Sequence, residues 1–117
     1  NRIFVKEYIE KYMRFDKSNF ENNNYFLTKE RAEEVADKIN FLLKLERLHD
    51  TFCPDYKPDW DNDWMGKFYV LFDNGNGKYI SNDAYSVDRG TTVYFDSRET
   101  ANKVCDVLNK ELENENL

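Results

Sequence analysis

The sequence is poor in the residues on which small catalytic, metal-binding and disulfide-bonded proteins depend. Its 117 residues include one histidine, two cysteines, two prolines and four glycines. Two isolated cysteines cannot build a disulfide framework, and they are typical of a reducing cytosol. No apolar run approaches the ~20 residues that a membrane span needs. Charge begins at Arg2, so no signal-peptide pattern is present. We therefore expect a cytoplasmic protein, inside a host cell, that carries no cofactor and contacts no membrane.

Aromatic residues and acidic residues are abundant. Hydrophobic residues make up 40% of the chain and aromatic residues 16%, which argues for a folded protein rather than a disordered one. The length predicts a single domain over residues 1–117. The formal net charge is −6, and this acidic balance makes direct nucleic-acid binding an unfavoured function.

An internal repeat organises the chain. Residues 25–40 align without a gap on residues 94–109, and seven of the 16 pairs are identical, where chance gives about one. The identical pairs are Tyr25/Tyr94, Phe26/Phe95, Glu30/Glu99, Ala32/Ala101, Val35/Val104, Asp37/Asp106 and Asn40/Asn109. We predict two pseudo-repeated strand–helix units, residues 1–50 and 67–117, joined by an acidic aromatic loop over residues 51–66.

Each copy of the repeat predicts a helix that follows a hydroxyl residue. Thr28 and Ser97 are suitable N-caps because their side-chain oxygens can accept a backbone N–H of the first turn. Apolar residues then recur at helical spacing, which is typical of an amphipathic helix. These residues are Ala32, Val35, Ala36, Ile39 and Leu43 in the first copy and Ala101, Val104, Cys105, Leu108 and Leu112 in the second. The first helix is expected to reach about Asp50, because Pro54 prevents its continuation.

The second unit has the pattern of a three-stranded antiparallel meander. The expected strands are Lys67–Phe72, Lys78–Ser81 and Thr91–Phe95, with turns at Asp73–Gly77 and Asp88–Gly90. The predicted fold class is α+β, with this sheet packed against two amphipathic helices. The two units are expected to share one interior and to leave no cleft lined with reactive groups.

The first twenty residues fit two patterns. Apolar residues at helical spacing favour a helix there: Phe4, Val5, Tyr8, Ile9, Tyr12 and Met13. The same residue types also favour strands, and the repeat argues for strands before Tyr25.

Short motifs in both copies carry a resemblance to a known group of proteins. They are Asn24-Tyr25-Phe26-x-Thr28-Lys29-Glu30, Asp59-Trp60, Lys67-Phe68-Tyr69-Val70 and Tyr94-Phe95-x-Ser97-x-Glu99. The chain resembles small accessory proteins of phages and prophages of Gram-positive bacteria. This resemblance implies a genomic setting and carries over no catalytic residue.

Two possible metal sites fail on their spacing. Asp59, Asp61 and Asp63 have the alternate rhythm that opens a calcium loop, but the sixth position is Trp64 where that loop needs glycine, and its twelfth is Val70 where it needs glutamate. His49 and Cys53 could share a helix face, yet zinc requires three or four ligands. We predict no metal site and no catalytic residue.

The connecting loop is the strongest candidate for contact with a partner. Both tryptophans fall within five residues, and residues 50–63 carry five aspartates against one lysine. Tryptophan and tyrosine dominate binding hot spots. The partner-binding candidates are Tyr56, Asp59, Trp60, Asp61, Asp63 and Trp64. The alternative is that these rings fold back as a lid over the core.

These observations lead to one functional hypothesis and three alternatives. The hypothesis is a non-enzymatic protein-binding module of phage or mobile-element origin that docks on a host or phage protein. In its narrower form it is an anti-CRISPR-like inhibitor of a host nuclease or defence complex. The alternatives are a single-stranded nucleic-acid-binding accessory protein, a small enzyme, and a homodimer formed through a sheet edge or the first helix (Leu42, Leu45 and Leu48).

Overall fold

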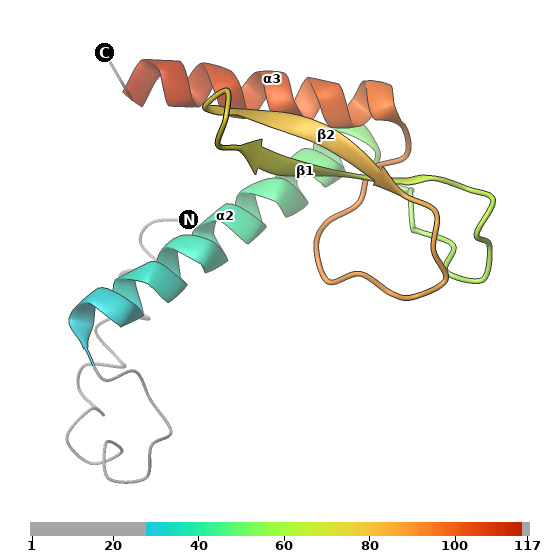
Figure 1. The fold of residues 1–117 in the computed structure, drawn as a ribbon, viewed down its shortest axis with the longest axis horizontal. Coiled ribbons are helices and arrows are strands. Elements are labelled where there is room, and N and C mark those ends of the chain that lie inside the picture. Colours follow the sequence, from blue (N-terminus) through green and yellow to red (C-terminus); the bar gives the residue numbers. More distant parts are fainter. Residues whose placement is uncertain (1–27, 116–117) are drawn as a thin grey trace, which may run out of the picture. The chain divides into compact units, whose positions relative to one another are not determined.

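The structure, a computed structural model, describes residues 28–115 and places two helices and two strands in that range (Figure 1). They are α2 (Lys29–Phe52), β1 (Lys67–Asp73), β2 (Lys78–Ala84) and α3 (Arg98–Glu115). The strands form a two-stranded antiparallel sheet, so the α+β class is confirmed. The expected strands before Tyr25 lie outside the described residues, as do Tyr25 and Phe26, the aromatic residues that begin the first copy of the repeat.

The chain divides into two compact units, Asn1–Lys44 and Leu45–Leu117. The first contributes most of α2 to the described residues. The second holds the end of α2, the hairpin and α3. Neither helix of the described range is long and apolar enough to cross a membrane.

Both helices begin as the repeat predicts. The Arg31 N–H donates to Oγ1 of Thr28 at 3.0 Å, and the Thr100 N–H donates to Oγ of Ser97 at 3.1 Å. Each cap satisfies a backbone donor that the first turn leaves without a helical acceptor, which contributes about 1 kcal/mol. The helix of the first copy ends at Phe52, two residues before Pro54. The two predicted N-caps are therefore confirmed.

The core of the second unit is built by the apolar stripe of α3. Its buried members are Ala101, Val104, Cys105 and Leu108. Other buried apolar residues of this unit include Leu45, Val70, Val93 and Phe95. Burial, followed by the nearby Asp106 carboxylate, raises the pKa of the Cys105 thiol to about 11. Cys105 therefore remains protonated at neutral pH and acts as a small core residue, as predicted.

The hairpin turn at Asp73–Gly77 is confirmed, and Asp73 organises it. Its backbone carbonyl accepts the Gly77 N–H at 2.7 Å, and its carboxylate accepts the Gly75 N–H at 2.9 Å and the Asn76 side-chain amide at 2.7 Å. Gly77 adopts a φ of 66°, a left-handed conformation that favours glycine. The turn sets the register in which Asp73 lies opposite Lys78 and Lys67 lies opposite Ala84.

Side chains of α3 cover the outer edge of β2. The Asn109 amide accepts the Tyr79 N–H at 2.8 Å and donates to the Tyr79 carbonyl at 3.1 Å. The Arg98 guanidinium donates to the Ser81 hydroxyl at 3.2 Å and is paired with Asp83. Such contacts satisfy backbone groups that another strand would otherwise use. They disfavour a homodimer formed through this sheet edge.

The predicted third strand, Thr91–Phe95, is wrong. The backbone of this segment pairs with β1 only at Phe95, whose N–H donates to the Phe68 carbonyl at 2.7 Å. Gly90 does not form the expected tight turn with Asp88, since no hydrogen-bonded turn occurs at residues 88–90. It instead lies against the Tyr94 ring, so close that an added Cβ would stand 1.6 Å from the hydroxyl oxygen. The chain after β2 therefore forms a wide loop and rejoins the sheet at a single residue.

Candidate functional site

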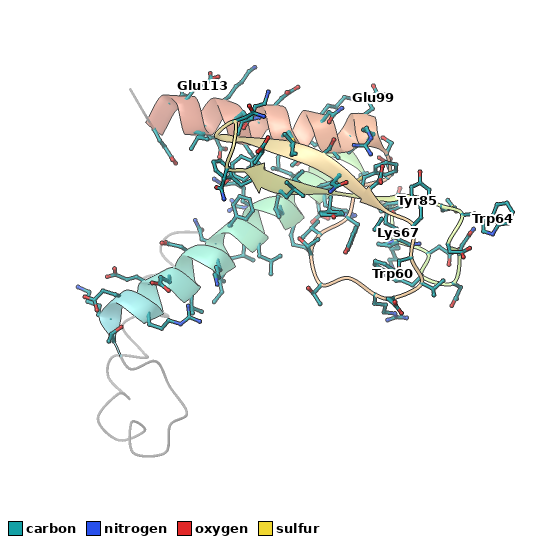
Figure 2. All side chains as sticks on the ribbon, in the orientation of Figure 1. Trp60, Trp64, Lys67, Tyr85, Glu99 and Glu113 are labelled. Carbon is teal, nitrogen blue, oxygen red and sulfur yellow. The ribbon has the colours of Figure 1, made fainter. Side chains whose placement is uncertain are left out.

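Lys67 fixes the end of the hairpin that lies opposite the turn. Lys67 is the first residue of β1, and it is buried, with 1% of its surface exposed. The ammonium donates to the carbonyls of Asn62 at 2.8 Å, Ser86 at 2.9 Å and Met65 at 3.3 Å. A buried charge requires such partners to offset its lost hydration. Lys67 thereby joins the loop before β1 to the loop after β2, as Figure 2 shows at the end of the sheet.

Trp60 packs inward on this cluster. The Lys67 ammonium stands 5.1 Å from the centroid of the indole ring, within the range of a cation–π contact. The Tyr94 ring meets the indole edge to face, with centroids 5.1 Å apart and an interplanar angle of 84°. Tyr69 continues the cluster, with its ring centroid 5.8 Å from that of Tyr94. For Trp60, these contacts match the lid alternative.

Trp64 has the opposite environment. Its residue is 88% exposed, and no aromatic contact within the described residues engages its ring. The Trp64 backbone is nevertheless ordered, because its N–H donates to Oδ1 of Asn62 at 2.9 Å. The loop thus holds the backbone and leaves the side chain in solvent (Figure 2).

Further exposed apolar side chains lie in the two loops at this end of the hairpin. Met65 is next in the chain, and Tyr85 and Val87 come from the loop that Lys67 joins to it. The Tyr85 ring lies against Gly66, where an added Cβ would stand 3.0 Å from ring and hydroxyl atoms. We call these four residues, Trp64, Met65, Tyr85 and Val87, the loop-end surface. Each of the four is more than half exposed.

Exposed aspartates lie in the same two loops. The four nearest in sequence to the loop-end surface are Asp59, Asp61, Asp63 and Asp88. The Asp59 carboxylate accepts the Asp61 N–H at 3.0 Å, which stabilises the loop locally. None of the four forms a salt bridge within residues 28–115. The loop-end surface is therefore flanked in sequence by acidic side chains that form no salt bridge within the described residues.

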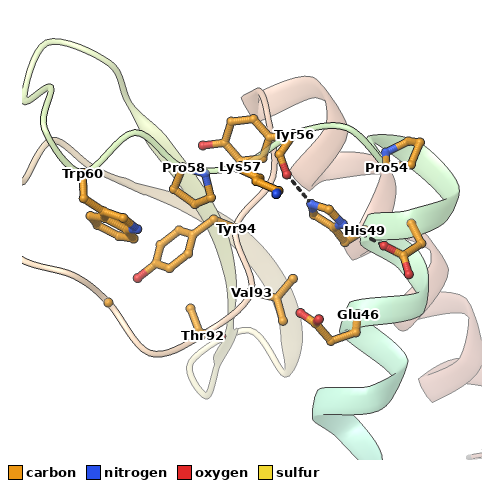
Figure 3. A pocket seen from close by; sticks show the side chains of 12 residues that line it. Glu46, His49, Pro54, Tyr56, Lys57, Pro58, Trp60, Thr92, Val93 and Tyr94 are labelled. Carbon is orange, nitrogen blue, oxygen red and sulfur yellow. Dashed lines mark hydrogen bonds and ion pairs between the residues drawn. The ribbon is translucent and has the colours of Figure 1, made fainter.

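An open pocket of about 390 Å³ lies on the other side of Trp60, between the end of α2, the loop after it and the segment before α3 (Figure 3). Its aromatic lining is Tyr56, Trp60 and Tyr94. Burial, and secondarily the neighbouring Tyr69, raises the pKa of Tyr94. Burial is also the main cause that raises the pKa of Tyr56. Both hydroxyls are therefore protonated donors at neutral pH.

The pocket corrects the expectation that no cleft would hold reactive groups, because His49, Glu46 and Asp50 also line it. The Nε2–H of His49 donates to the Tyr56 carbonyl at 2.9 Å, and Nδ1 lies 3.1 Å from the Asp50 carboxylate. Cys53 does not line the pocket. Burial raises the pKa of its thiol, which disfavours the thiolate that a nucleophile needs. Within residues 28–115, no three histidine, cysteine or acidic side chains gather as a metal-binding group.

The structure separates the six candidate residues into three environments. Tyr56 and Trp60 line the pocket, Trp64 is on the loop-end surface, and three aspartates lie exposed between them: Asp59, Asp61 and Asp63. Sequence reasoning missed Lys67, Tyr85 and Val87. The sequence carried one signal for Lys67. Side chains two positions apart on a strand point to the same face, so Lys67 shares a face with Tyr69 and Leu71 on an otherwise apolar strand. Comparison with protein-family models, curated proteins and solved structures finds no match to this chain.

Proposed function

We propose that the chain is a non-enzymatic protein-binding module whose contact residues are centred on Trp64. The observation that carries the proposal is the 88% exposure of Trp64 on a backbone that a hydrogen bond to Asn62 holds in place. An exposed apolar cluster on a small protein is unfavourable in water unless a partner covers it. Trp64 supplies the type of side chain that dominates binding hot spots.

The charge around the surface points to a basic partner. Asp59, Asp61, Asp63 and Asp88 are exposed, and they would face lysine or arginine side chains of the bound protein. Such complementarity accelerates association and selects the partner, and salt weakens it.

The Lys67 cluster supports the proposal because it lowers the cost of ordering the contact residues. Lys67 holds both loops before a partner arrives, through the carbonyls of Met65 and Ser86. Binding then needs little further loss of backbone freedom, which favours affinity.

In the narrower form of the proposal, the module comes from a phage or mobile element and acts in the cytoplasm of its host. Its acidic loops would occupy a basic nucleic-acid channel of a host nuclease or defence complex, as an anti-CRISPR-like inhibitor does. The resemblance in the sequence and the exposed aspartates of these loops support this form.

Affinity capture with three versions of the full chain tests the proposal. Immobilised wild type, Trp64→Ala and Phe52→Ala are exposed to lysate of a Gram-positive bacterium, and Phe52 serves as the control because it is an exposed aromatic residue at the end of α2. We expect wild type and Phe52→Ala to retain the same protein, and Trp64→Ala to retain about tenfold less. Raising salt from about 50 to about 500 mM should weaken the retention. Equal capture by Trp64→Ala, or no specific capture by the wild type, would overturn the proposal.

Self-association through α2 is the second candidate function, because Leu42 is 44% exposed and Leu43 36% exposed. The sequence predicted this dimer through Leu42, Leu45 and Leu48. That set needs correction, because Leu45 is 3% exposed and belongs to the core. Sedimentation of wild type and Leu42→Glu distinguishes the candidates. A concentration-dependent dimer that Leu42→Glu abolishes would support self-association, and a monomer at all concentrations would exclude it.

A further inference from the structure

The pocket beside Trp60 carries an inference that rests on the proposed protein-binding function and names one kind of segment it would recognise. We propose that the pocket binds an extended, proline-rich peptide that carries a basic side chain. The argument uses the walls of the pocket, its hydrogen-bond donors, its charge and its rigidity.

Aromatic and proline rings form part of the walls of the pocket. Tyr56, Trp60 and Tyr94 supply aromatic surfaces, Pro58 supplies an aliphatic ring between Trp60 and Tyr56, and Pro54 lies beyond His49 (Figure 3). Grooves lined by tryptophan and tyrosine suit proline rings, which lie flat against them in the polyproline II conformation.

Some donors on the residues that line the pocket lack a protein acceptor. The indole N–H of Trp60 and the hydroxyls of Tyr56 and Tyr94 donate no hydrogen bond to any other residue in the described part of the chain. A ligand suited to them offers carbonyl oxygens and few N–H groups of its own. A proline-rich backbone does so, because proline has no N–H and the polyproline II helix makes no internal hydrogen bonds.

The charge of the pocket favours a cation on the ligand. Two carboxylates line it, those of Glu46 and Asp50, against the single ammonium of Lys57. The Asp50 carboxylate already lies at His49, whereas Glu46 pairs with no cation among residues 28–115. The Glu46 carboxylate lies on the side of Thr92 and Val93 (Figure 3). An arginine at one end of the peptide would place its guanidinium there.

The rings are held in place before any ligand binds. Trp60 is held by its contacts with the Lys67 ammonium and with the Tyr94 ring. Gly90 lies directly against the Tyr94 ring, so that ring has little room to move. A preformed site loses little conformational entropy on binding, which suits a ligand that is itself stiff.

Fluorescence titration of the Trp64→Phe protein tests the proposal, because Trp60 is then the sole tryptophan. The probes are a synthetic hexaproline peptide with one terminal arginine, the same peptide without arginine, and a glycine–serine peptide with the arginine. We expect a saturable change with a Kd of about 1 mM or tighter for the first probe. The second should bind a few-fold more weakly and the glycine–serine peptide at least about tenfold more weakly.

Two pairs of variants in the same background assign the contacts. Tyr94→Phe keeps the ring and removes the donor, so it should weaken binding about three- to tenfold, whereas Tyr79→Phe, outside the pocket, should not. Glu46→Gln should weaken the binding of the arginine-containing peptides only. Glu113 is an exposed acid near the end of α3, and Glu113→Gln should leave the affinity for every peptide unchanged.

Three results would overturn the proposal: no saturable change up to about 5 mM peptide, equal affinity for the proline and glycine–serine peptides, or wild-type affinity in Tyr94→Phe. The test is separate from the capture experiment. Absent peptide binding with Trp64-dependent capture would remove only the peptide site, whereas peptide binding with Trp64-independent capture would remove only the proposed role of the loop-end surface.

Discussion

The two ends of the hairpin are stabilised in opposite ways. At the turn, Asp73 makes its hydrogen bonds to residues no more than four positions away. At the other end, Lys67 reaches a carbonyl 19 positions along the chain, at Ser86. The turn end is a local structure that sets the register of the strands. The loop end depends on a buried charge that joins two loops, and it is the end that displays Trp64.

This difference indicates where stability and function lie. A local turn tolerates changes in the rest of the fold, since all its partners are neighbours in sequence. A loop end held by one buried side chain concentrates its stability in that residue. Changes at the two ends should therefore differ in size, and the predictions below test that order.

The largest expected effect follows from Lys67→Met, which keeps the length of the side chain and removes its charge. Three carbonyls lose their donor, so the free energy of unfolding should fall by about 3 kcal/mol. Urea denaturation measures it. Lys78→Met, at the turn end and exposed, is the control and should change stability by less than about 0.5 kcal/mol. Equal stability of Lys67→Met and wild type would show that the cluster does not hold the loops.

The second prediction concerns Gly90→Ala in the loop after β2. The added Cβ would stand 1.6 Å from the Tyr94 hydroxyl, so either the ring or the loop must move. We expect a loss of about 1–3 kcal/mol, measured by thermal unfolding. In a Tyr94→Ala background the same change should have a much smaller effect, because the obstructing ring is gone. Additive losses in the double variant would contradict the close packing.

At the turn end, Gly77→Ala should destabilise the protein by about 1 kcal/mol. The cause is the backbone alone, since φ is 66° and no atom lies within 4 Å of an added Cβ. Urea denaturation of Gly77→Ala and Gly77→Asn checks this cause. Asparagine tolerates the left-handed region better, so Gly77→Asn should recover part of the loss. If both variants were as stable as wild type, the positive φ would not be needed.

The smallest predicted effect is a pH dependence at Asp73. The Asn76 side-chain amide is the main cause that holds the pKa of this carboxyl below its ordinary value of 3.8. The folded state then binds the proton less readily than the unfolded chain. Its stabilising contribution is present above the ordinary pKa and is lost as the pH falls through the lower, folded pKa. Urea denaturation between about pH 2 and pH 5 should therefore show a shallower acid loss in Asn76→Ala than in wild type or Asn74→Ala. Identical profiles would contradict the prediction.

The features predicted correctly from the sequence are those that depend on neighbouring residues. The Thr28 and Ser97 caps and the Asp73–Gly77 turn each need only a few positions of chain, so composition and spacing were sufficient. The buried stripe of α3 was likewise visible from its periodicity.

The features that sequence reasoning missed depend on contacts between distant segments. Thr91–Phe95 has the composition of a strand, but Gly90 and Tyr94 pack together and keep it from pairing beyond Phe95. The burial of Lys67 depends on carbonyls from two loops, and no local sequence pattern predicts that these carbonyls meet at Lys67. Sequence reasoning identified the loop that carries the candidate residues. It could not predict the different environments of Trp60 and Trp64, because these depend on the same contacts between distant segments.

Acrylamide quenching of the two single-tryptophan proteins, Trp60→Phe and Trp64→Phe, tests the central claim that the loop end retains Trp60 and displays Trp64. The account predicts that Trp64 emits at longer wavelength and is quenched several-fold more strongly than Trp60, because it is 88% exposed while Trp60 packs against Tyr94 and Lys67. In the Lys67→Met background the two should become more alike. Equal quenching of the two tryptophans in the otherwise unchanged protein would contradict the account.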